Sequence, residues 1–266
     1  MARRTTKRPA KAAPKRSAKR LAPDIEGTLL DRRLTPEQEP EVLATIVREL
    51  GQGVTRTRDI WPAVTIFGSA RFKPSSAHYK LARATGKAFA QAGFSVMTGG
   101  GPGIMEAGNR GAKEGGGRSI GCNIILPHEQ SANRWCDEVV SFEYFFTRKA
   151  ILRLRSVAFI VMPGGVGTLD ECFEVMTLLQ TGKLQGFPLI FMGVKFWRPL
   201  KPFFEDSMLV EGTVERKELH FAHYTDDPEE AVAIVEAAAS SGTIKARSSK
   251  KSGRLDRPPQ GRRNAR

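Results

Sequence analysis

The sequence predicts an α/β protein in which a Rossmann-like, doubly wound parallel sheet forms a single domain. Short buried strands alternate with amphipathic helical segments along the chain, which is the pattern of parallel sheets with helical crossovers. Two of these strands, at 94–97 and 157–162, run directly into glycine-rich turns, and a helix begins after each turn. Small residues also follow the first strand, and open α/β sheets bind ligands at the carboxyl ends of their strands.

The formal charge of +14 is concentrated at the two ends of the chain. Residues 1–20 contribute +9 and residues 240–266 contribute +8, which leaves −3 for the chain between them. These ends contain few large apolar residues, so they cannot bury enough surface to offset the entropy of ordering. We therefore expect disordered basic arms at 1–34 and 241–266, on either side of a folded domain at 35–240.

Two interpretations of the arms stay open. They are either solvated tails or a salt-sensitive, sequence-independent contact with nucleic acid. No apolar segment follows the basic N-terminus, which argues against a secretory signal, although organelle transit peptides are also Arg-rich and acid-poor. No run approaches ~18 apolar residues, the length that a membrane-spanning helix needs. Three widely spaced cysteines, Cys122, Cys136 and Cys172, form neither a disulfide framework nor a zinc pattern. We expect a cytoplasmic protein.

The domain begins with a predicted helix over 35–51. Thr35 is the expected N-cap, Pro36 occupies the first position, and Gln38 completes a capping box. The apolar face and the glycines expected to end this helix are Val42, Ile46, Val47, Leu50, Gly51 and Gly53.

Six strands and six further helices follow, and the segment 127–137 between the third and fourth strands is expected to form a flap or a short helical turn. Gly93 should close the first of these helices, and Asp227 should begin the last one as its N-cap. The strands are predicted at 63–67, 94–97, 119–126, 138–142, 157–162 and 188–192, and the helices at 76–92, 104–113, 145–155, 168–179, 197–210 and 228–239.

The stretch Pro163–Glu171 organises the domain, because it joins a buried strand to a helix through glycines. Backbone N–H groups and a helix N-terminus then converge on one point, where they can hold an anion. Thr168 and Glu171 also have the spacing of a capping box, which alone would explain both residues. The alternative is that Glu171 faces a bound ligand, whereas Asp170 is expected to interact with the helix dipole.

A second glycine turn, 99–103, opens the helix that carries Glu106. On spacing alone, Glu106 is explained by the helix dipole, and Ser69 is either a turn residue or a phosphate donor. Neither turn has the spacing of a P-loop or of a dinucleotide fingerprint. His220 and His223 lack a carboxylate or cysteine partner, so they are expected to be ordinary surface or core histidines. The residues therefore predict a phosphate-bearing small molecule bound between two glycine turns.

Four motifs along the chain carry a resemblance to a known family. They are Phe67–Arg71, Gly99–Ala107, Arg148-Lys149 and Pro163–Glu171. Taken in order, they resemble the LOG family over about 60–238. The family includes cytokinin-activating enzymes and cleaves the N-glycosidic bond of nucleoside 5′-monophosphates to free base and ribose 5-phosphate. Its members have often been labelled lysine decarboxylases, a reaction that would need pyridoxal phosphate on a lysine, whereas Lys149 stands beside the arginine that completes the phosphoribohydrolase pattern.

The resemblance implies a hydrolase for AMP or N6-modified AMP that needs no metal and no organic cofactor. It implies that Glu171, Arg148 and Glu106 are catalytic. It also implies a homodimer with the site close to the subunit contact. An alternative from a different class is a non-catalytic nucleotide-sensing module that the arms tether to nucleic acid. The expected phosphate and ribose contacts are Ser69, Gly100, Gly101, Gly103, Lys149, Gly164, Gly165, Gly167 and Thr168.

Overall fold

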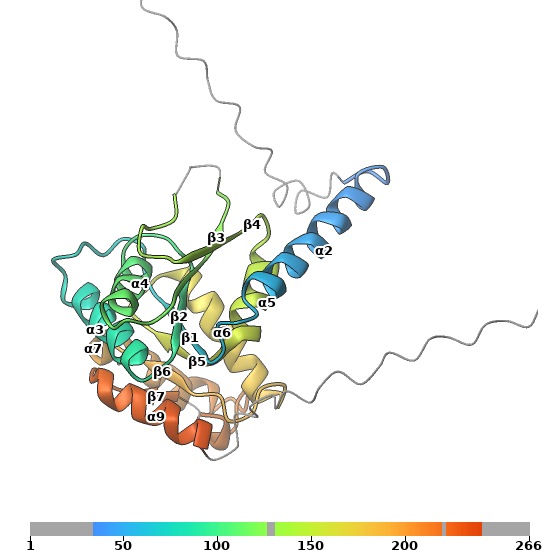
Figure 1. Ribbon diagram of the computed structural model, residues 1–266. Helices are drawn as coiled ribbons and strands as arrows, with labels where there is room; N and C mark the ends of the chain where they lie inside the picture. The colour runs from blue at the N-terminus through green and yellow to red at the C-terminus, as the bar shows by residue number, and fades with distance from the viewer. Residues whose placement is uncertain (1–33, 127–130, 220–221, 241–266) are drawn as a thin grey trace, which may run out of the picture.

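The computed structural model describes residues 34–126, 131–219 and 222–240, which form a seven-stranded sheet with helices on both faces (Figure 1). The strand order is β4-β3-β2-β1-β5-β6-β7, and every neighbouring pair is parallel. The chain moves outward from β1 to β4 and then returns to place β5 on the other side of β1. The order therefore reverses between β1 and β5, where open α/β sheets bind ligands. The strands are β1 Ala63–Phe67, β2 Ser95–Thr98, β3 Ser119–Ile124, β4 Glu138–Phe142, β5 Ser156–Val161, β6 Leu189–Phe191 and β7 Ala222–Tyr224.

The helices form two layers, which confirms the doubly wound fold. Helices α2, α5 and α6 cover one face of the sheet, while α3, α4 and α9 cover the other. The predicted helices at 76–92, 104–113, 145–155 and 228–239 agree with the structure to within about two residues, as is usual for helix ends. The bounds are α2 Glu39–Arg56, α3 Ala77–Gln91, α4 Ile104–Glu114, α5 Phe145–Arg155, α6 Val166–Gln180 and α9 Pro228–Ser240.

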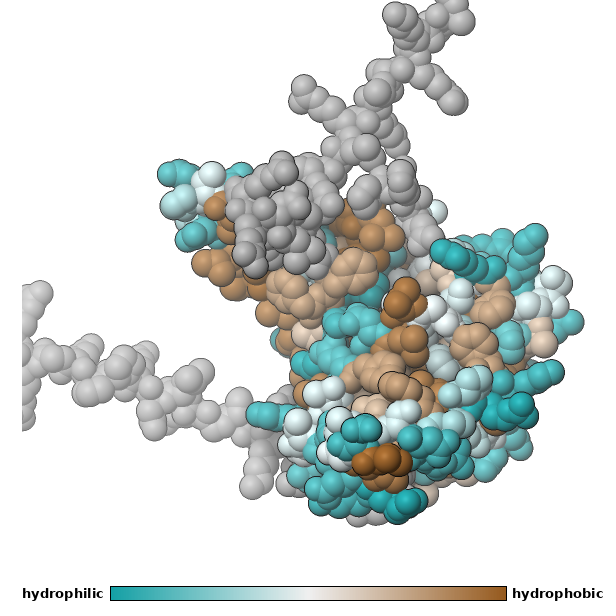
Figure 2. Space-filling model, turned by 180° about the vertical axis from the view of Figure 1, so that it is seen from behind, coloured by the Kyte–Doolittle hydropathy of each residue, from teal (hydrophilic) through white to brown (hydrophobic). Residues whose placement is uncertain are grey.

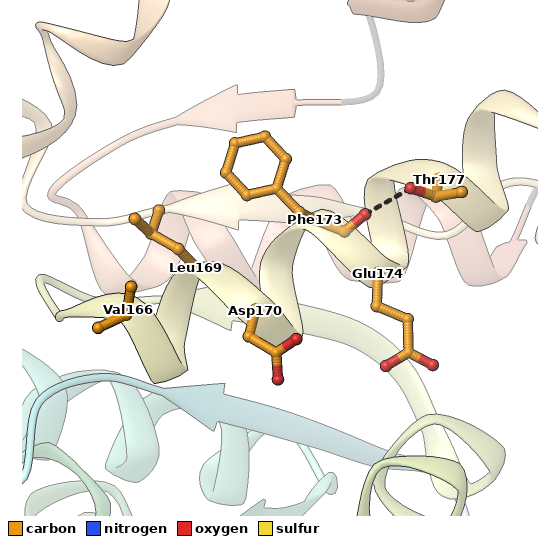
Figure 3. A pocket seen from close by; sticks show the side chains of 6 residues that line it. All are labelled: Val166, Leu169, Asp170, Phe173, Glu174 and Thr177. Atoms are coloured by element: carbon orange, nitrogen blue, oxygen red, sulfur yellow. Dashed lines mark hydrogen bonds between the residues drawn. The ribbon is translucent and has the colours of Figure 1, made fainter. Parts of the chain in front are cut away.

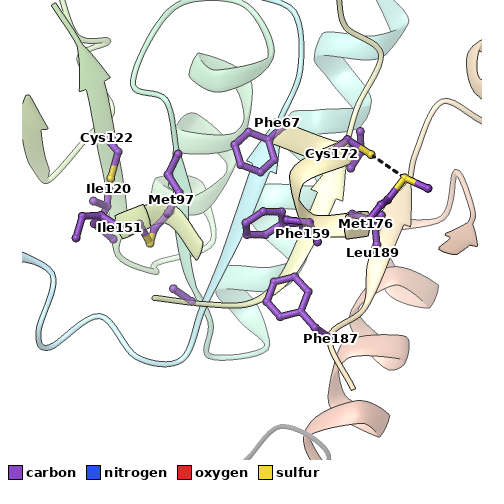
Figure 4. Close-up of a cluster of buried hydrophobic side chains, with 14 of the residues drawn as sticks. Phe67, Met97, Ile120, Cys122, Ile151, Phe159, Cys172, Met176, Phe187 and Leu189 are labelled. Atoms are coloured by element: carbon purple, nitrogen blue, oxygen red, sulfur yellow. Dashed lines mark hydrogen bonds between the residues drawn. The ribbon is translucent and has the colours of Figure 1, made fainter. Parts of the chain in front are cut away.

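Two hydrophobic cores lie on the opposite faces of the sheet, because successive side chains of a strand point to opposite faces. In β1, Phe67 belongs to the core under α5 and α6, whereas Val64 and Ile66 belong to the core under α3 and α4. Figure 4 shows part of the first core, in which Phe67 meets the edge of the Phe159 ring with the ring centres 4.8 Å apart. All five side chains of β1 are buried, so the strand is fixed from both faces.

Helix α2 differs from its prediction at both ends. It begins at Glu39, after Gln38 Oε1 accepts a hydrogen bond from the backbone N–H of Thr35 (2.9 Å), and it continues through both glycines to Arg56. Gly53 is retained inside the helix because a Cβ there would overlap Ile151 of α5. Val47, which was expected on the inner face, is 69% exposed, and hydrophobic residues reach the surface over this helix (Figure 2).

The segment after β6 also departs from the prediction of one helix over 197–210. The structure has two short helices and then a π-helical turn, because Pro199 and Pro202 lack the N–H that an α-helix needs. Strand β7 was not predicted, since three residues carry too little pattern to identify a strand. The short elements are α7 Val194–Trp197, α8 Leu200–Pro202, the π-helix Phe203–Met208 and the 3₁₀ helix Arg216–Leu219.

Both basic arms, residues 127–130 of the expected flap and His220 lie outside the described residues. Among the residues that the structure does describe, no helix combines the length and the apolar character needed to cross a membrane. No group of three His, Cys, Asp or Glu side chains in the same part of the chain could hold a metal ion.

Candidate active site at the carboxyl ends of β1 and β5

A cavity of about 450 Å³ opens at the point where the strand order reverses. Its walls come from the turn after β1, the end of β3, one face of α5 and the N-terminal part of α6. The turns after β1 and β5 are joined, because Ser69 N–H donates to Pro163 O (3.0 Å). The lining residues are Phe67, Gly68, Ser69, Ala70, Arg71, Gly99, Met105, Ile124, Leu126, Phe145, Arg148, Leu152, Gly165, Val166, Gly167, Thr168 and Glu171.

The N-terminus of α6 faces this cavity. Gly165 is the N-cap, so the amides of Val166 and Gly167 lie in the first turn, where the helix itself supplies no acceptor. A Cβ at Gly165 or Gly167 would meet no atom within 4 Å, which shows open space beside these amides. Gly164 has a different reason to be glycine, because a Cβ there would overlap the side chain of Thr168. The turn therefore places a helix dipole, and amides for which the helix itself supplies no acceptor, beside a cavity, an arrangement that favours an anion.

Glu171 lies one turn further along α6, with its side chain only 5% exposed. Its Oε1 accepts a hydrogen bond from Arg148 Nη2 at 2.8 Å, which makes a buried ion pair. Burial raises the pKa of Glu171 to about 7, although the adjacent Arg148 guanidinium opposes that rise. A carboxyl group with a pKa near neutrality can accept a proton and return it.

The alternative interpretation of Thr168 and Glu171 as a capping box is wrong. The helix begins three residues earlier than that pattern requires, so Thr168 already lies inside it and donates its backbone N–H to Gly165 O (3.0 Å). The expected helix-dipole role of Asp170 is wrong for the same reason, since this residue lies beyond the first turn. A helix cap therefore does not explain Glu171, whose carboxylate pairs with Arg148 instead.

Arg148 reaches the cavity from α5. Phe145, Arg148 and Leu152 are spaced by three and four residues, so they share one face of the helix, and all three line the cavity. The Arg148 guanidinium lies over the Phe145 ring at 5.0 Å. Within the described part of the chain, the buried Arg148 Nε has no hydrogen-bond partner. A buried donor without a partner costs about 1–3 kcal/mol unless a ligand or water satisfies it.

The second glycine turn supports the site from behind. Gly103 has φ +67° and lies so close to Ser69 O and Ala70 that a Cβ would overlap them. Ile104 N–H donates to Ser69 O (3.0 Å), while Ser69 Oγ accepts from Arg71 N–H (3.2 Å). This turn therefore fixes the position of Ser69, and only Gly99 of its five residues lines the cavity.

Gly100 and Gly101 bind another part of the chain instead. Asn133 donates its side-chain amide to the carbonyl oxygens of both glycines at 3.0 Å, and to Asn109 Oδ1 at 2.9 Å. Asn109 is fully buried and also contacts Thr98 Oγ1 at 2.6 Å. These contacts fasten the segment that follows residue 130 to the glycine turn.

Glu106 and Lys149 do not line the cavity. Glu106 Oε1 accepts a hydrogen bond from the Tyr79 hydroxyl at 3.0 Å, which directs the carboxylate towards α3. Lys149 Nζ lies between Asp170 and Glu174 of α6, at 3.2 and 2.9 Å. Figure 3 shows these two acids on the same side of α6, in an open hollow of about 410 Å³ on its outer surface. Lys149 is thus part of the contact between α5 and α6.

The structure brings six of the twelve predicted site residues together around the cavity: Ser69, Arg148, Gly165, Gly167, Thr168 and Glu171. The other six, Gly100, Gly101, Gly103, Glu106, Lys149 and Gly164, lie behind or beside it.

Sequence reasoning missed the apolar wall of the cavity. Helical spacing from Arg148 could have identified Phe145 and Leu152, and alternation at the end of β3 could have identified Ile124 and Leu126.

Comparisons with known proteins match the motif-bearing part of the chain. The sequence profile of a family described as "Possible lysine decarboxylase" matches residues 105–235. A protein of Rhodococcoides fascians named cytokinin riboside 5′-monophosphate phosphoribohydrolase is 30% identical over 159 residues, which are 57% of this chain and 78% of that protein. Proteins of the same name from Mycobacterium marinum and Mycobacterium tuberculosis are 40% and 39% identical over 100 residues, 37% of this chain. The chain spans about half the length of these two relatives, 54%.

Among solved structures, a molybdenum cofactor carrier protein from Chlamydomonas reinhardtii is similar with a TM-score of 0.49 and 24% identity, covering 67% of this chain and 98% of that one. The profile match includes both Arg148 and Glu171, whose geometry is described above. The sequence relatives, and the Rhodococcoides fascians protein in particular, show that the chain belongs to the LOG family.

Proposed function

We propose that this protein hydrolyses the N-glycosidic bond of a nucleoside 5′-monophosphate, AMP or an N6-modified AMP, to release the free base and ribose 5-phosphate. One observation carries the proposal. The buried Glu171–Arg148 pair lies in the same cavity as the unpaired amides at the N-terminus of α6. The relatives named as phosphoribohydrolases support the same reaction.

In this proposal the 5′-phosphate binds at the start of α6, with the hydroxyls of Thr168 and Ser69 as further donors. An α-helix rises 1.5 Å per residue, so Glu171 lies about 6 Å along the axis from Gly167. The ribose then extends from the phosphate towards the carboxylate. Phosphate binding far from the reacting bond holds C1′ in place and lowers the entropic cost of reaction.

Cleavage of the C1′–N bond develops positive charge on the ribose ring, as in glycoside hydrolysis. Glu171 in its ionised form stabilises that charge and accepts a proton from the attacking water. Arg148 lines the same cavity, so its guanidinium can donate a hydrogen bond to the departing base. The apolar wall of Ile124, Leu126 and Phe145 provides a surface for the base.

The description of the family as a lysine decarboxylase does not fit this site. A pyridoxal phosphate enzyme needs a lysine amine that can form a Schiff base with the cofactor. Among the described residues, no lysine lines the cavity. Lys149, the nearest in the motif, is held by Asp170 and Glu174 on the outer side of α6.

The test is base release by the purified full-length chain from a panel of nucleoside 5′-monophosphates, followed by chromatography of the products. Wild type is expected to release adenine or its N6-modified form, and Glu171→Gln is expected to lower kcat by at least ~100-fold while AMP still binds. Glu174→Gln, on the same helix but outside the cavity, should keep activity. Binding of AMP without base release from any monophosphate would contradict the proposal and favour a non-catalytic nucleotide-binding module.

The other functional expectations remain predictions. Glu106 and Lys149 lie outside the cavity wall that the described residues form, and their functional roles stay predictions. The homodimer, the cytoplasmic location and the contact between basic arms and nucleic acid depend on assemblies or on residues outside the described ranges. Light scattering and salt-dependent RNA binding, with and without 1–22 and 241–266, test the homodimer and the nucleic-acid contact.

A further inference from the structure

A buried acid on α2 holds the helix that carries Arg148. Glu49 is 4% exposed, although it lies on the first helix of the domain and far from the cavity in sequence. Its Oε1 accepts the backbone N–H of Glu143 at 2.5 Å, and its Oε2 accepts the hydroxyl of Thr147 at 2.6 Å. Glu143 immediately precedes the N-cap residue of α5 and Thr147 lies in the first turn, and the N-cap residue Tyr144 makes no side-chain cap hydrogen bond.

A carboxylate at this place has two roles. It accepts the Glu143 N–H just before α5 and the Thr147 hydroxyl in the first turn of the helix. It also lies near the N-terminus of α5, where the helix dipole favours an acidic group. The Thr147 hydroxyl, which has one hydrogen to share, lies between Glu49 Oε2 (2.6 Å) and Tyr144 O (2.8 Å), so it connects the first turn of α5 to α2.

The contact between the two helices keeps one register along its whole length. Glu49 meets Thr147, Gly53 meets Ile151, and Thr57 Oγ1 accepts from Arg155 Nε at 3.0 Å, each 98 residues apart. A Cβ at Gly53 would overlap Ile151, so the helices are in direct contact there. Helix α5 is therefore fixed at its start, middle and end by α2, which precedes the residues matched by the family profile.

We propose that Glu49 is a positioning residue for the active site, acting through Thr147 on the neighbouring Arg148. This inference rests on the proposed function. Arg148 extends from the first turn of α5 to Glu171 at 2.8 Å, so a shift of that turn separates the pair. A displacement of about 1 Å at a reacting group can lower the rate by about 100-fold.

The test compares Glu49→Ala with Glu49→Gln. Alanine leaves the Glu143 N–H without an acceptor and removes the bond between Glu49 and Thr147, whose hydroxyl then has only Tyr144 O. Glutamine can accept the Glu143 N–H and donate its amide to the Thr147 oxygen. Glu49→Ala is expected to lower kcat for AMP by about tenfold or more with KM within about threefold, because the phosphate site on α6 is untouched. Glu49→Gln should restore kcat to within about threefold of wild type, since it refills the contact.

Two controls separate positioning from a general loss of stability. Val232→Ala removes buried atoms from α9 on the opposite face of the sheet, and it should lower the melting temperature without changing kcat. In an Arg148→Ala background, Glu49→Ala should cost less than about twofold in kcat, because residues that act through one group are not additive. If Glu49→Ala does not fold, Thr147→Val removes the same contact and takes its place in the comparison. An equal loss in the Arg148→Ala background, or unchanged kcat in Glu49→Ala, overturns the proposal.

A second readout does not depend on catalysis. Carbon-13 NMR of the glutamate carboxyls follows the titration of Glu171, which Glu171→Gln assigns. The Arg148 guanidinium lowers the pKa of Glu171, so displacement of α5 in Glu49→Ala should raise that pKa, and Val232→Ala should leave it unchanged. Wild type that cleaves no monophosphate would refute the proposed function alone. An unchanged Glu171 titration in Glu49→Ala would refute the positioning role alone.

Discussion

Replacement of Glu171 by glutamine should make the protein more stable while removing its proposed activity. In the folded protein the pKa of Glu171 is raised to about 7, and its ordinary value is 4.5. The folded state therefore holds this proton over a pH range in which the unfolded chain has released it, so stability falls as pH rises from about 4.5 to about 7. At 1.36 kcal/mol per pH unit, this difference lowers the free energy of unfolding by about 3 kcal/mol above pH 7.

Urea unfolding of wild type and Glu171→Gln at pH 5, 6, 7 and 8 measures this pH-dependent loss of unfolding free energy, because all other titrating groups are common to both proteins. The stability gap in favour of the variant should grow with pH by about 3 kcal/mol and level off above pH 7. Proposed activity should follow the opposite trend in wild type, since the ionised carboxylate is the base and forms as pH rises through about 7. A gap that does not change between pH 5 and pH 8 would refute a raised pKa at Glu171.

Three further predictions address neighbouring groups. Arg148→Ala should lower kcat for AMP by at least ~100-fold with AMP binding retained; an unchanged kcat in the base-release assay would contradict its role. Gly164→Ala should displace Thr168 and raise KM by about tenfold through a distorted phosphate site, whereas Gly51→Ala, whose Cβ meets no atom within 4 Å, should leave KM unchanged. Asn109→Ala breaks a buried polar network and should cost about 1–3 kcal/mol of unfolding free energy; a loss in urea unfolding below ~0.5 kcal/mol would show that the network is dispensable.

The fold was predictable because the inner strands β1, β2, β5 and β6 are buried on both faces, and a strand of that kind tends to be a continuous apolar run. Strand β1 is a clear case, since the residues from Ala63 to Phe67 match the prediction without change. The errors arose where local signals competed with packing. Gly51 and Gly53 normally favour a helix end, but Gly53 is required by its contact with Ile151. No local pattern contains that information, because the partner lies 98 residues away in the chain.

The site was predictable only where a motif carries its own geometry. The turn before α6 could be identified as an anion site from its glycines, and Glu171 from its place in the motif. The sequence could not reveal that α6 begins at Val166. This start excludes the capping box, and the Glu171 carboxylate binds Arg148 instead. The resemblance also placed Glu106 and Lys149 at the site, because both belong to motifs of the family. Their side chains point elsewhere, since adjacent positions on a helix differ by about 100° in direction.

The proposed phosphate site at Gly165–Thr168 and the carboxylate of Glu171 belong to one uninterrupted helix of 15 residues, α6, and its N-cap. Their separation is therefore set by backbone hydrogen bonds and does not vary with the motion of any loop. A substrate whose phosphate is attached at a different ribose carbon would hold C1′ at another height along the helix, out of reach of Glu171. Discrimination between phosphate isomers thus follows from the helix rise itself.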